Sequence, residues 1–270
     1  MNRIDSLFGR LRSQGKRALM PFITAGDPDL ETTLEVIAAM VGAGADMVEV
    51  GFPYSDPIAD GPVISESYTR ALRKGVRLAG VFATLAAARA RIGETPLVGM
   101  VSYAIIHKMG VESFLEAATA SGLDGLIVPD LPVEEAEALG ASMQQRGLAL
   151  IQLITPTTPA DRALRIARST TGFIYYVSVA GITGERKALP AELASSVARL
   201  REQVDLPVCI GFGVSTPEQI RELADLADGL IVGSAIVRRF AEPKPREELV
   251  AEVARFVAEL AAPLATIGRS

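Results

Sequence analysis

Short apolar runs alternate with longer amphipathic runs from one end of the chain to the other. The apolar runs have the length typical of buried strands and span residues 18–24, 46–51, 97–103, 125–129, 148–154, 172–178, 207–213 and 229–233. Between them apolar residues recur at helical spacing, as over 29–44, 111–122, 132–147, 159–169, 189–203, 216–226 and 246–262. This alternation predicts a parallel sheet covered by helices on both faces.

Two folds are compatible with this pattern, a closed (β/α)8 barrel and an open, doubly wound sheet. The even spacing of the predicted strands over 270 residues, with no linker or change of composition, favours the barrel. We therefore expect an α/β fold, a (β/α)8 TIM barrel that forms a single domain over residues 1–270.

The first segment of the chain predicts an extra N-terminal helix. In MNRIDSLFGRLRSQGKR the apolar residues Ile4, Leu7, Phe8 and Leu11 lie at helical spacing. The segment is basic, but it contains Asp5 and lacks the apolar core of a secretory signal. We expect a short amphipathic helix that covers one end of the domain.

Side chains alternate between the two faces of a strand, and this alternation orients Glu49. In the run 46–51, Val48 and Val50 share one face and Met47 and Glu49 share the other. The two valines suit the layer between strands and helices, so Glu49 should point into the barrel. It would lie near the carboxyl end of its strand, which is where barrel enzymes place their chemistry.

The stretch VEVGFPYSDPIADGP, which ends this strand, contains three acids, three prolines and no cation. The nearest cations along the chain are Arg17 and Arg70. Burial without a local cation should raise the pKa of Glu49 and suit it to proton transfer, although a structural Glu paired with a distant Arg is the alternative. Asp60 precedes Gly61 and Pro62 and is as compatible with a turn as with catalysis, whereas for Asp56 a turn is favoured.

Glycine-rich segments follow three of the late strands: AGITG (180–184), GFG (211–213) and VGSAIV (232–237). Glycine lets backbone amides approach an anion, and a helix that starts after such a segment adds free N–H groups. The loops after the seventh and eighth strands of barrels often hold phosphate. Together the segments predict a phosphorylated ligand, while turn glycines are the alternative for each one alone.

Composition excludes several classes of function. A net charge of −5 argues against nucleic acid or an anionic membrane as the main partner, and no apolar run is long enough to span a bilayer. The single cysteine, Cys209, lies in an apolar strand and cannot form an internal disulfide. With His107 as the only histidine, a His-rich metal site is unavailable, and we expect no metal.

The residues needed for Schiff-base catalysis and for dinucleotide binding are also missing from the expected positions. No predicted strand carries a lysine for a Schiff base, and the first strand is not followed by the dinucleotide fingerprint. Carboxylates as acid and base and a phosphorylated substrate remain. Because anionic side chains stabilise a developing cation, the substrate should contain its own electron sink and become positive during the reaction.

These motifs resemble those of the tryptophan synthase alpha chain family. VEVGFPYSDPIADGP is similar to the family's signature, and PFITAGDP, PDLPVEE, GFIYYVSVAGITG, GFGVSTPEQI and VGSAIV follow in the family's order. The resemblance implies a cytoplasmic lyase of tryptophan biosynthesis. Its reaction would be the retro-aldol cleavage of indole-3-glycerol phosphate to indole and glyceraldehyde 3-phosphate, with the indole ring as the electron sink.

The resemblance also implies the roles of individual residues. Glu49 would transfer the proton, Asp60 would accept the indole N–H, and Tyr175 would assist proton transfer. The implied indole pocket consists of Phe22, Met100, Thr183 and Phe212, and the implied phosphate site consists of Gly184, Gly213, Gly233 and Ser234. The segment 180–190 would close over the substrate and pack on the Asp60 loop.

The family works as an α2β2 assembly, which implies a beta chain as partner. Pyridoxal phosphate would be the cofactor of that beta chain, with no cofactor in this chain, and Asp56 and Pro57 would lie at the interface. One departure concerns the family's Tyr-x-Asn-Pro, which here is Tyr103-Ala104-Ile105-Ile106. Ile105 in place of Asn puts the usual intersubunit contact in doubt.

Other functions remain open at this stage. The chain could be a free-standing lyase that releases indole, or a catalytically weak subunit that activates a beta chain. A sugar-phosphate isomerase on the same fold fits less well, because the usual Lys and His are missing.

Overall fold

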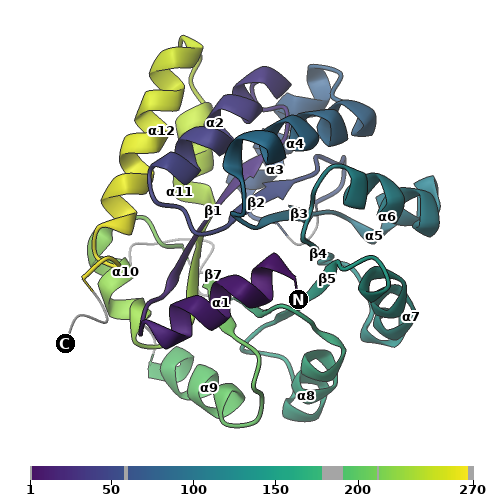
Figure 1. Ribbon diagram of the computed structural model, residues 1–270, viewed down its shortest axis with the longest axis vertical. Coiled ribbons are helices and arrows are strands. Elements are labelled where there is room, and N and C mark those ends of the chain that lie inside the picture. The colour runs from purple at the N-terminus through teal and green to yellow at the C-terminus, as the bar shows by residue number, and fades with distance from the viewer. Residues whose placement is uncertain (1, 58–59, 178–190, 212, 267–270) are drawn as a thin grey trace.

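The structure, a computed structural model, describes residues 2–57, 60–177, 191–211 and 213–266. Within these ranges eight parallel strands close into a barrel in chain order, with β8 paired to β1 (Figure 1). The strands are β1 (Ala18–Thr24), β2 (Val48–Gly51), β3 (Leu97–Met100), β4 (Gly125–Ile127), β5 (Ala149–Ile154), β6 (Ile174–Val177), β7 (Val208–Gly211) and β8 (Gly229–Val232). The predicted barrel is confirmed, and the open sheet is wrong.

Most helices surround the barrel wall, as Figure 1 shows, and connect one strand to the next. Those of the described residues are α1 (Arg3–Ser13), α2 (Leu30–Gly42), α3 (Pro62–Arg73), α4 (Leu78–Ile92), α5 (Tyr103–Met109), α6 (Val111–Ala120), α7 (Val133–Gln144), α8 (Ala160–Ser169), α9 (Ala191–Arg201), α10 (Pro217–Ala224), α11 (Ser234–Val237), the 3-10 helix Arg238–Phe240 and α12 (Arg246–Ala261). None of these described helices combines the length and apolar character needed to span a bilayer.

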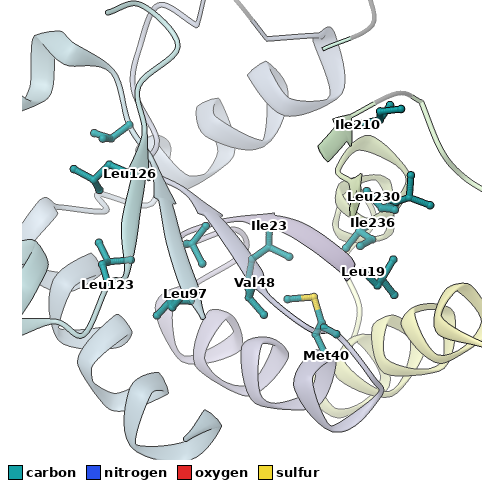
Figure 2. Close-up of a cluster of buried hydrophobic side chains, with 14 of the residues drawn as sticks. Leu19, Ile23, Met40, Val48, Leu97, Leu123, Leu126, Ile210, Leu230 and Ile236 are labelled. Atoms are coloured by element: carbon teal, nitrogen blue, oxygen red, sulfur yellow. The ribbon is translucent and has the colours of Figure 1, made fainter. Parts of the chain in front are cut away.

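Strand side chains alternate between two apolar layers, as the sequence predicted. Leu19 and Val48 belong to the layer between strands and helices, and Figure 2 shows them near Met40 of α2. Met20 and Phe22 belong to a second cluster inside the barrel. Each large apolar side chain buried in this way contributes about 1.5–3 kcal/mol, so the alternation fixes which side chains face inward.

Helix α1 covers the amino-terminal end of the barrel, which confirms the predicted N-terminal helix. Its apolar face is buried, and Phe8 contacts Phe173 of the barrel interior at 5.9 Å between ring centroids. Asn2 caps the helix and donates hydrogen bonds to the backbone oxygens of Asp124 (2.7 Å) and Gly147 (2.6 Å). This end is therefore occupied by a helix, which leaves the carboxyl ends of the strands for a binding site.

The prediction of a strand over 97–103 was wrong at its end. Strand β3 stops at Met100, and Ser102 begins α5 as its N-cap. The Ser102 hydroxyl donates to Asp130 Oδ2 (2.6 Å), and the backbone N–H of Tyr103 donates to Asp130 Oδ1 (2.7 Å). The Ser102 cap is a local signal that the sequence contains, whereas its contact with Asp130 in a distant loop could not be predicted from it.

Helices α3 and α4 were not predicted from the sequence. In α3 the buried residues Ile64, Tyr68 and Ala71 recur at helical spacing, after a proline at the start of the helix. In α4 Val81 and Leu85 are buried one helical turn apart. A helical signal was therefore present in both segments and was overlooked.

Candidate active site

A cavity of about 200 Å³ opens at the carboxyl ends of the strands. Two carboxyl groups line it, those of Glu49 and Asp60. The rest of its wall is mostly apolar and includes Phe22, Ile64, Met100, Ile127, Leu153, Tyr175 and Ile231. A concave apolar site with a few polar groups is the usual form of a small-molecule site, so this cavity is the candidate active site.

Glu49 lies inside the barrel wall on β2, with only 1% of its surface exposed. Its Oε2 accepts no hydrogen bond from the described residues. Burial, and to a smaller extent the charge of Asp60, raises the pKa of Glu49 to about 8. At neutral pH Glu49 is therefore mostly a neutral carboxylic acid and can donate a proton.

Asp60 is half-buried at the end of the loop that follows β2. Burial raises its pKa to about 6, while a hydrogen bond from the Tyr54 hydroxyl, 3.4 Å from Oδ2, lowers it. Asp60 is thus mostly ionised at neutral pH. Since Glu49 is still neutral when Asp60 loses its proton, the repulsion between the two raises the pKa of Glu49.

The turn around Asp60 is held by backbone groups. Its N–H donates to the oxygen of Pro57 (3.2 Å), and its own carbonyl accepts a long hydrogen bond from Ser65 (3.4 Å). No hydrogen bond joins the Asp60 carboxylate to a described backbone group. The carboxylate therefore remains available to the cavity, although the residue also sits in a turn.

The nearest downstream cation, Arg70, is paired elsewhere. It donates two hydrogen bonds to the buried carboxylate of Asp27, at 3.0 and 2.6 Å. Asp27 lies in the loop after β1, so the ion pair ties this loop to α3. Among the described residues neither Glu49 nor Asp60 forms an ion pair, and the alternative of a Glu49–Arg pair finds no support there.

Two glycines make room for aromatic side chains of the cavity. A Cβ on Gly211 would lie 2.6 Å from the hydroxyl oxygen of Tyr175, and a Cβ on Gly51 would lie 2.6 Å from Cζ of Phe22. Burial, with the charges of Glu49 and Asp60, raises the pKa of Tyr175. Tyr175 is therefore a neutral phenol, which can donate a hydrogen bond but is a poor base.

Glycines form another part of the cavity wall. Gly211, Gly213, Gly233 and Ser234 line it, and α11 begins at Ser234. The first N–H groups of a helix have no acceptor within that helix. Two of the three predicted glycine segments thus reach one cavity, where the start of α11 adds backbone N–H groups, and the third, 180–184, lies outside the described residues.

The structure brings most of the predicted site residues to this one cavity: Phe22, Glu49, Asp60, Met100, Tyr175, Gly213, Gly233 and Ser234. Thr183, Gly184, Phe212 and the segment 180–190 lie outside the described residues. The predicted interface residues do not line the cavity. Asp56 is exposed, Pro57 is half-buried, and Ile105 on α5 is half-buried against the outer apolar layer.

Family comparison adds independent information to this geometry. The family profile described as tryptophan synthase alpha chain matches residues 8–264. The chain belongs to the tryptophan synthase alpha chain family. The tryptophan synthase alpha chain of Rhodopirellula baltica is 54% identical over 244 residues, which cover 90% of this chain and 88% of that one. That of Thermoanaerobacter sp. (strain X514) is 42% identical over 260 residues, covering 96% and 98%.

Solved structures of the tryptophan synthase alpha chain family have the same fold. The crystal structure of tryptophan synthase subunit alpha from Legionella pneumophila matches with a TM-score of 0.90 at 34% identity, covering 99% of this chain and 100% of that chain. The family resemblance inferred from the motifs is therefore confirmed.

Sequence patterns missed part of the site of this tryptophan synthase alpha chain family member. Ile127, Leu153 and Ile231 line the cavity from predicted strands, and strand alternation could have identified them. Ile64 lies on α3, which was not predicted, and the contact of Tyr54 with Asp60 depends on how a loop folds.

His107 and Cys209 do not line the cavity. His107 is exposed on α5, beside the Tyr103 ring. Cys209 is buried inside the barrel, where burial raises the pKa of its thiol. The described residues contain no group of three or more His, Cys, Asp or Glu placed to hold a metal ion.

Proposed function

We propose that this chain is the alpha subunit of a tryptophan synthase and a carbon–carbon lyase. It cleaves indole-3-glycerol phosphate to indole and glyceraldehyde 3-phosphate. The observation that carries the proposal is the pair of carboxyl groups on one apolar cavity, Glu49 neutral and Asp60 ionised at neutral pH. Two carboxyl groups with separated pKa values can divide the roles of acid and charge stabiliser.

The first step is protonation of the indole ring. Glu49 donates its proton to ring carbon C3, and the ring becomes a cation with charge on its nitrogen. Asp60 accepts a hydrogen bond from the ring N–H and stabilises that charge. In a water-poor, apolar cavity such an interaction is stronger than in bulk water.

The second step breaks the carbon–carbon bond. Glu49, now a carboxylate, takes the proton of the hydroxyl group next to the bond, and the bonding electrons return to the ring. Indole and the aldehyde form, and Glu49 ends the cycle protonated. Tyr175 assists as a neutral hydrogen-bond donor near both carboxyl groups.

The remaining site residues bind the substrate. We infer that Phe22 and Met100 contact the indole ring, and that Gly213, Gly233 and Ser234 bind the phosphate. Thr183, Phe212 and Gly184 complete these two subsites in the proposal, and the segment 180–190 closes over them.

The proposal extends to the partner. The chain would assemble with a tryptophan synthase beta chain as α2β2, in the cytoplasm, with residues 1–270 as one domain. Pyridoxal phosphate would belong to the beta chain, and this chain would need no cofactor of its own. Asp56 and Pro57, on the rim of the Asp60 loop, would contact the beta chain, and Ile105 would take the place of a polar contact there.

The decisive experiment is a cleavage assay with purified chain and indole-3-glycerol phosphate, with and without a beta chain. We expect indole and glyceraldehyde 3-phosphate in equal amounts, faster with the beta chain. Glu49→Gln, which keeps the shape of the side chain, should abolish cleavage and leave binding of a phosphorylated ligand intact. If the chain cleaves the substrate as fast without the beta chain as with it, it is a free-standing lyase. If no cleavage is seen with or without the beta chain, the proposal is rejected.

A further inference from the structure

Tyr54 contacts one oxygen of Asp60. It lies in the same loop after β2, half-buried, and its hydroxyl donates to Asp60 Oδ2 at 3.4 Å. Among the described residues no hydrogen bond reaches the other oxygen, Oδ1. The distance is long for an O–H···O hydrogen bond, so the contact guides the carboxylate without fixing it rigidly.

The Tyr54 ring is itself held by a neighbour. It packs on the ring of Tyr68 with 5.4 Å between centroids and an interplanar angle of 46°. Tyr68 belongs to α3 and is fully buried in the cluster inside the barrel. A tilted aromatic pair with one buried member restricts both rings, so the Tyr54 hydroxyl is held near Asp60.

Among the described residues no cation competes for this carboxylate. The described ionisable groups that act on Asp60 or Tyr54 are acids or phenols: Glu49, Tyr68 and Tyr175 around Asp60, and Asp56 and Asp130 around Tyr54. Within the described part of the chain Asp60 is in no ion pair. The Tyr54 hydroxyl is therefore the side-chain donor that the described residues offer to the ionised form of Asp60.

We propose that Tyr54 is a positioning residue for Asp60, whose hydroxyl holds Oδ2 and leaves Oδ1 to accept the ring N–H of the substrate. This inference rests on the proposed function. Loss of the hydroxyl removes a donor from the ionised carboxylate, so the pKa of Asp60 rises and the group rotates more freely.

The test is the pH profile of kcat/KM for Tyr54→Phe between pH ~5 and ~9. Losing a hydrogen bond to a carboxylate should move the acid limb to higher pH by up to about one unit. The loss in kcat/KM is then close to tenfold below pH ~5.5, about twofold near neutral pH, and small above pH ~8. A purely structural role would instead lower the profile equally at every pH.

Tyr68→Phe is the matched control. It removes the other hydroxyl of the same ring pair, and that hydroxyl is buried without a hydrogen-bond partner among the described residues. We expect no shift of the acid limb for Tyr68→Phe. In an Asp60→Asn background, Tyr54→Phe should have no pH-dependent effect, because the two changes act through one contact. The substrate phosphate titrates in the same way with every variant, so its effect cancels when the pH profiles are compared.

The outcomes separate the inference from the function on which it rests. If the unaltered chain does not cleave indole-3-glycerol phosphate, the proposed function fails. If the unaltered chain does cleave it, two results reject the role of Tyr54. One is a Tyr54→Phe pH profile that coincides with the profile of the unaltered chain, and the other is an equal shift of the acid limb in Tyr68→Phe. A shift in Tyr54→Phe alone supports it.

Discussion

At the scale of single residues, two carboxyl groups on one cavity carry different charges at neutral pH. Glu49 is 1% exposed and accepts no hydrogen bond at Oε2 from the part of the chain that the structure describes, so its neutral form is favoured. Asp60 is less buried and has the Tyr54 hydroxyl as a donor, so its ionised form is less disfavoured. Burial and one hydrogen bond thus separate the two pKa values, as the proposed division into a proton donor and a charge stabiliser requires.

We predict a bell-shaped pH dependence of kcat/KM for cleavage. The active form has Asp60 ionised and Glu49 protonated, so activity should rise as pH passes the pKa of Asp60, about 6, and fall as it passes that of Glu49, about 8. The measurement is the initial rate of indole formation at low substrate concentration. A rate that keeps rising well above pH ~8.5 would show that Glu49 is not the acid.

Asp60→Asn tests the second role. The amide keeps the shape of the side chain but removes the negative charge that, in the proposed mechanism, stabilises the ring cation. We expect kcat to fall roughly 10²–10³-fold, with phosphate-ligand binding almost unchanged. The check is kcat together with the dissociation constant of a phosphorylated ligand, and a near-normal kcat would remove Asp60 from the mechanism.

The sequence predicted some of these site residues better than others. The inward orientation of Glu49 followed from strand alternation, because the side-chain period of two is strict. The role proposed for Asp60 required the family resemblance, since an Asp before Gly-Pro is equally compatible with a turn. The Tyr54–Asp60 contact lies within a loop, and no periodicity predicts where loop side chains point.

At the scale of elements, a strand position without a side chain makes room for a side chain from the neighbouring strand. Strands β6 and β7 pair in parallel, with Val177 opposite Gly211. The Tyr175 hydroxyl occupies the space that a side chain at position 211 would need. The alternation of elements was readable from the sequence, but this close approach was not, because it depends on the register between two strands.

Gly211→Ala should therefore displace Tyr175. A Cβ only 2.6 Å from the phenol oxygen forces the ring of Tyr175 to move. We expect a loss of stability of about 1–3 kcal/mol and a clear drop in kcat/KM. Urea unfolding and the cleavage assay measure the two effects.

Gly42→Ala is the control for this substitution. Gly42 is exposed on α2, and an added Cβ would meet nothing within 4 Å. Alanine there should be neutral or stabilise the protein by up to about 1 kcal/mol, with no change in cleavage. Equal behaviour of the two variants would mean that position 211 does not set the place of Tyr175.

At the scale of the whole molecule, the buried acid links stability to pH. The folded-state pKa of Glu49, about 8, lies above its ordinary value of 4.5. The neutral form is favoured by folding, so the contribution of Glu49 to stability is fully present below pH ~4.5 and is lost as the pH rises through ~8. In the proposed mechanism, the proton that Glu49 donates is also the proton that keeps its own buried side chain uncharged.

Glu49→Gln should therefore stabilise the fold at alkaline pH while abolishing activity. Glutamine stays neutral throughout, so the free energies of unfolding of the two proteins should agree near pH ~4.5 and diverge by on the order of 3–5 kcal/mol at pH ~8.5. Glu116→Gln is the control: it removes a carboxylate from the exposed face of α6, and its effect on the free energy of unfolding should be small. Urea unfolding across this range measures both differences. A gap for Glu49→Gln that stays constant with pH would mean that Glu49 is already ionised in the folded protein, and the acid in the mechanism would have to be another group.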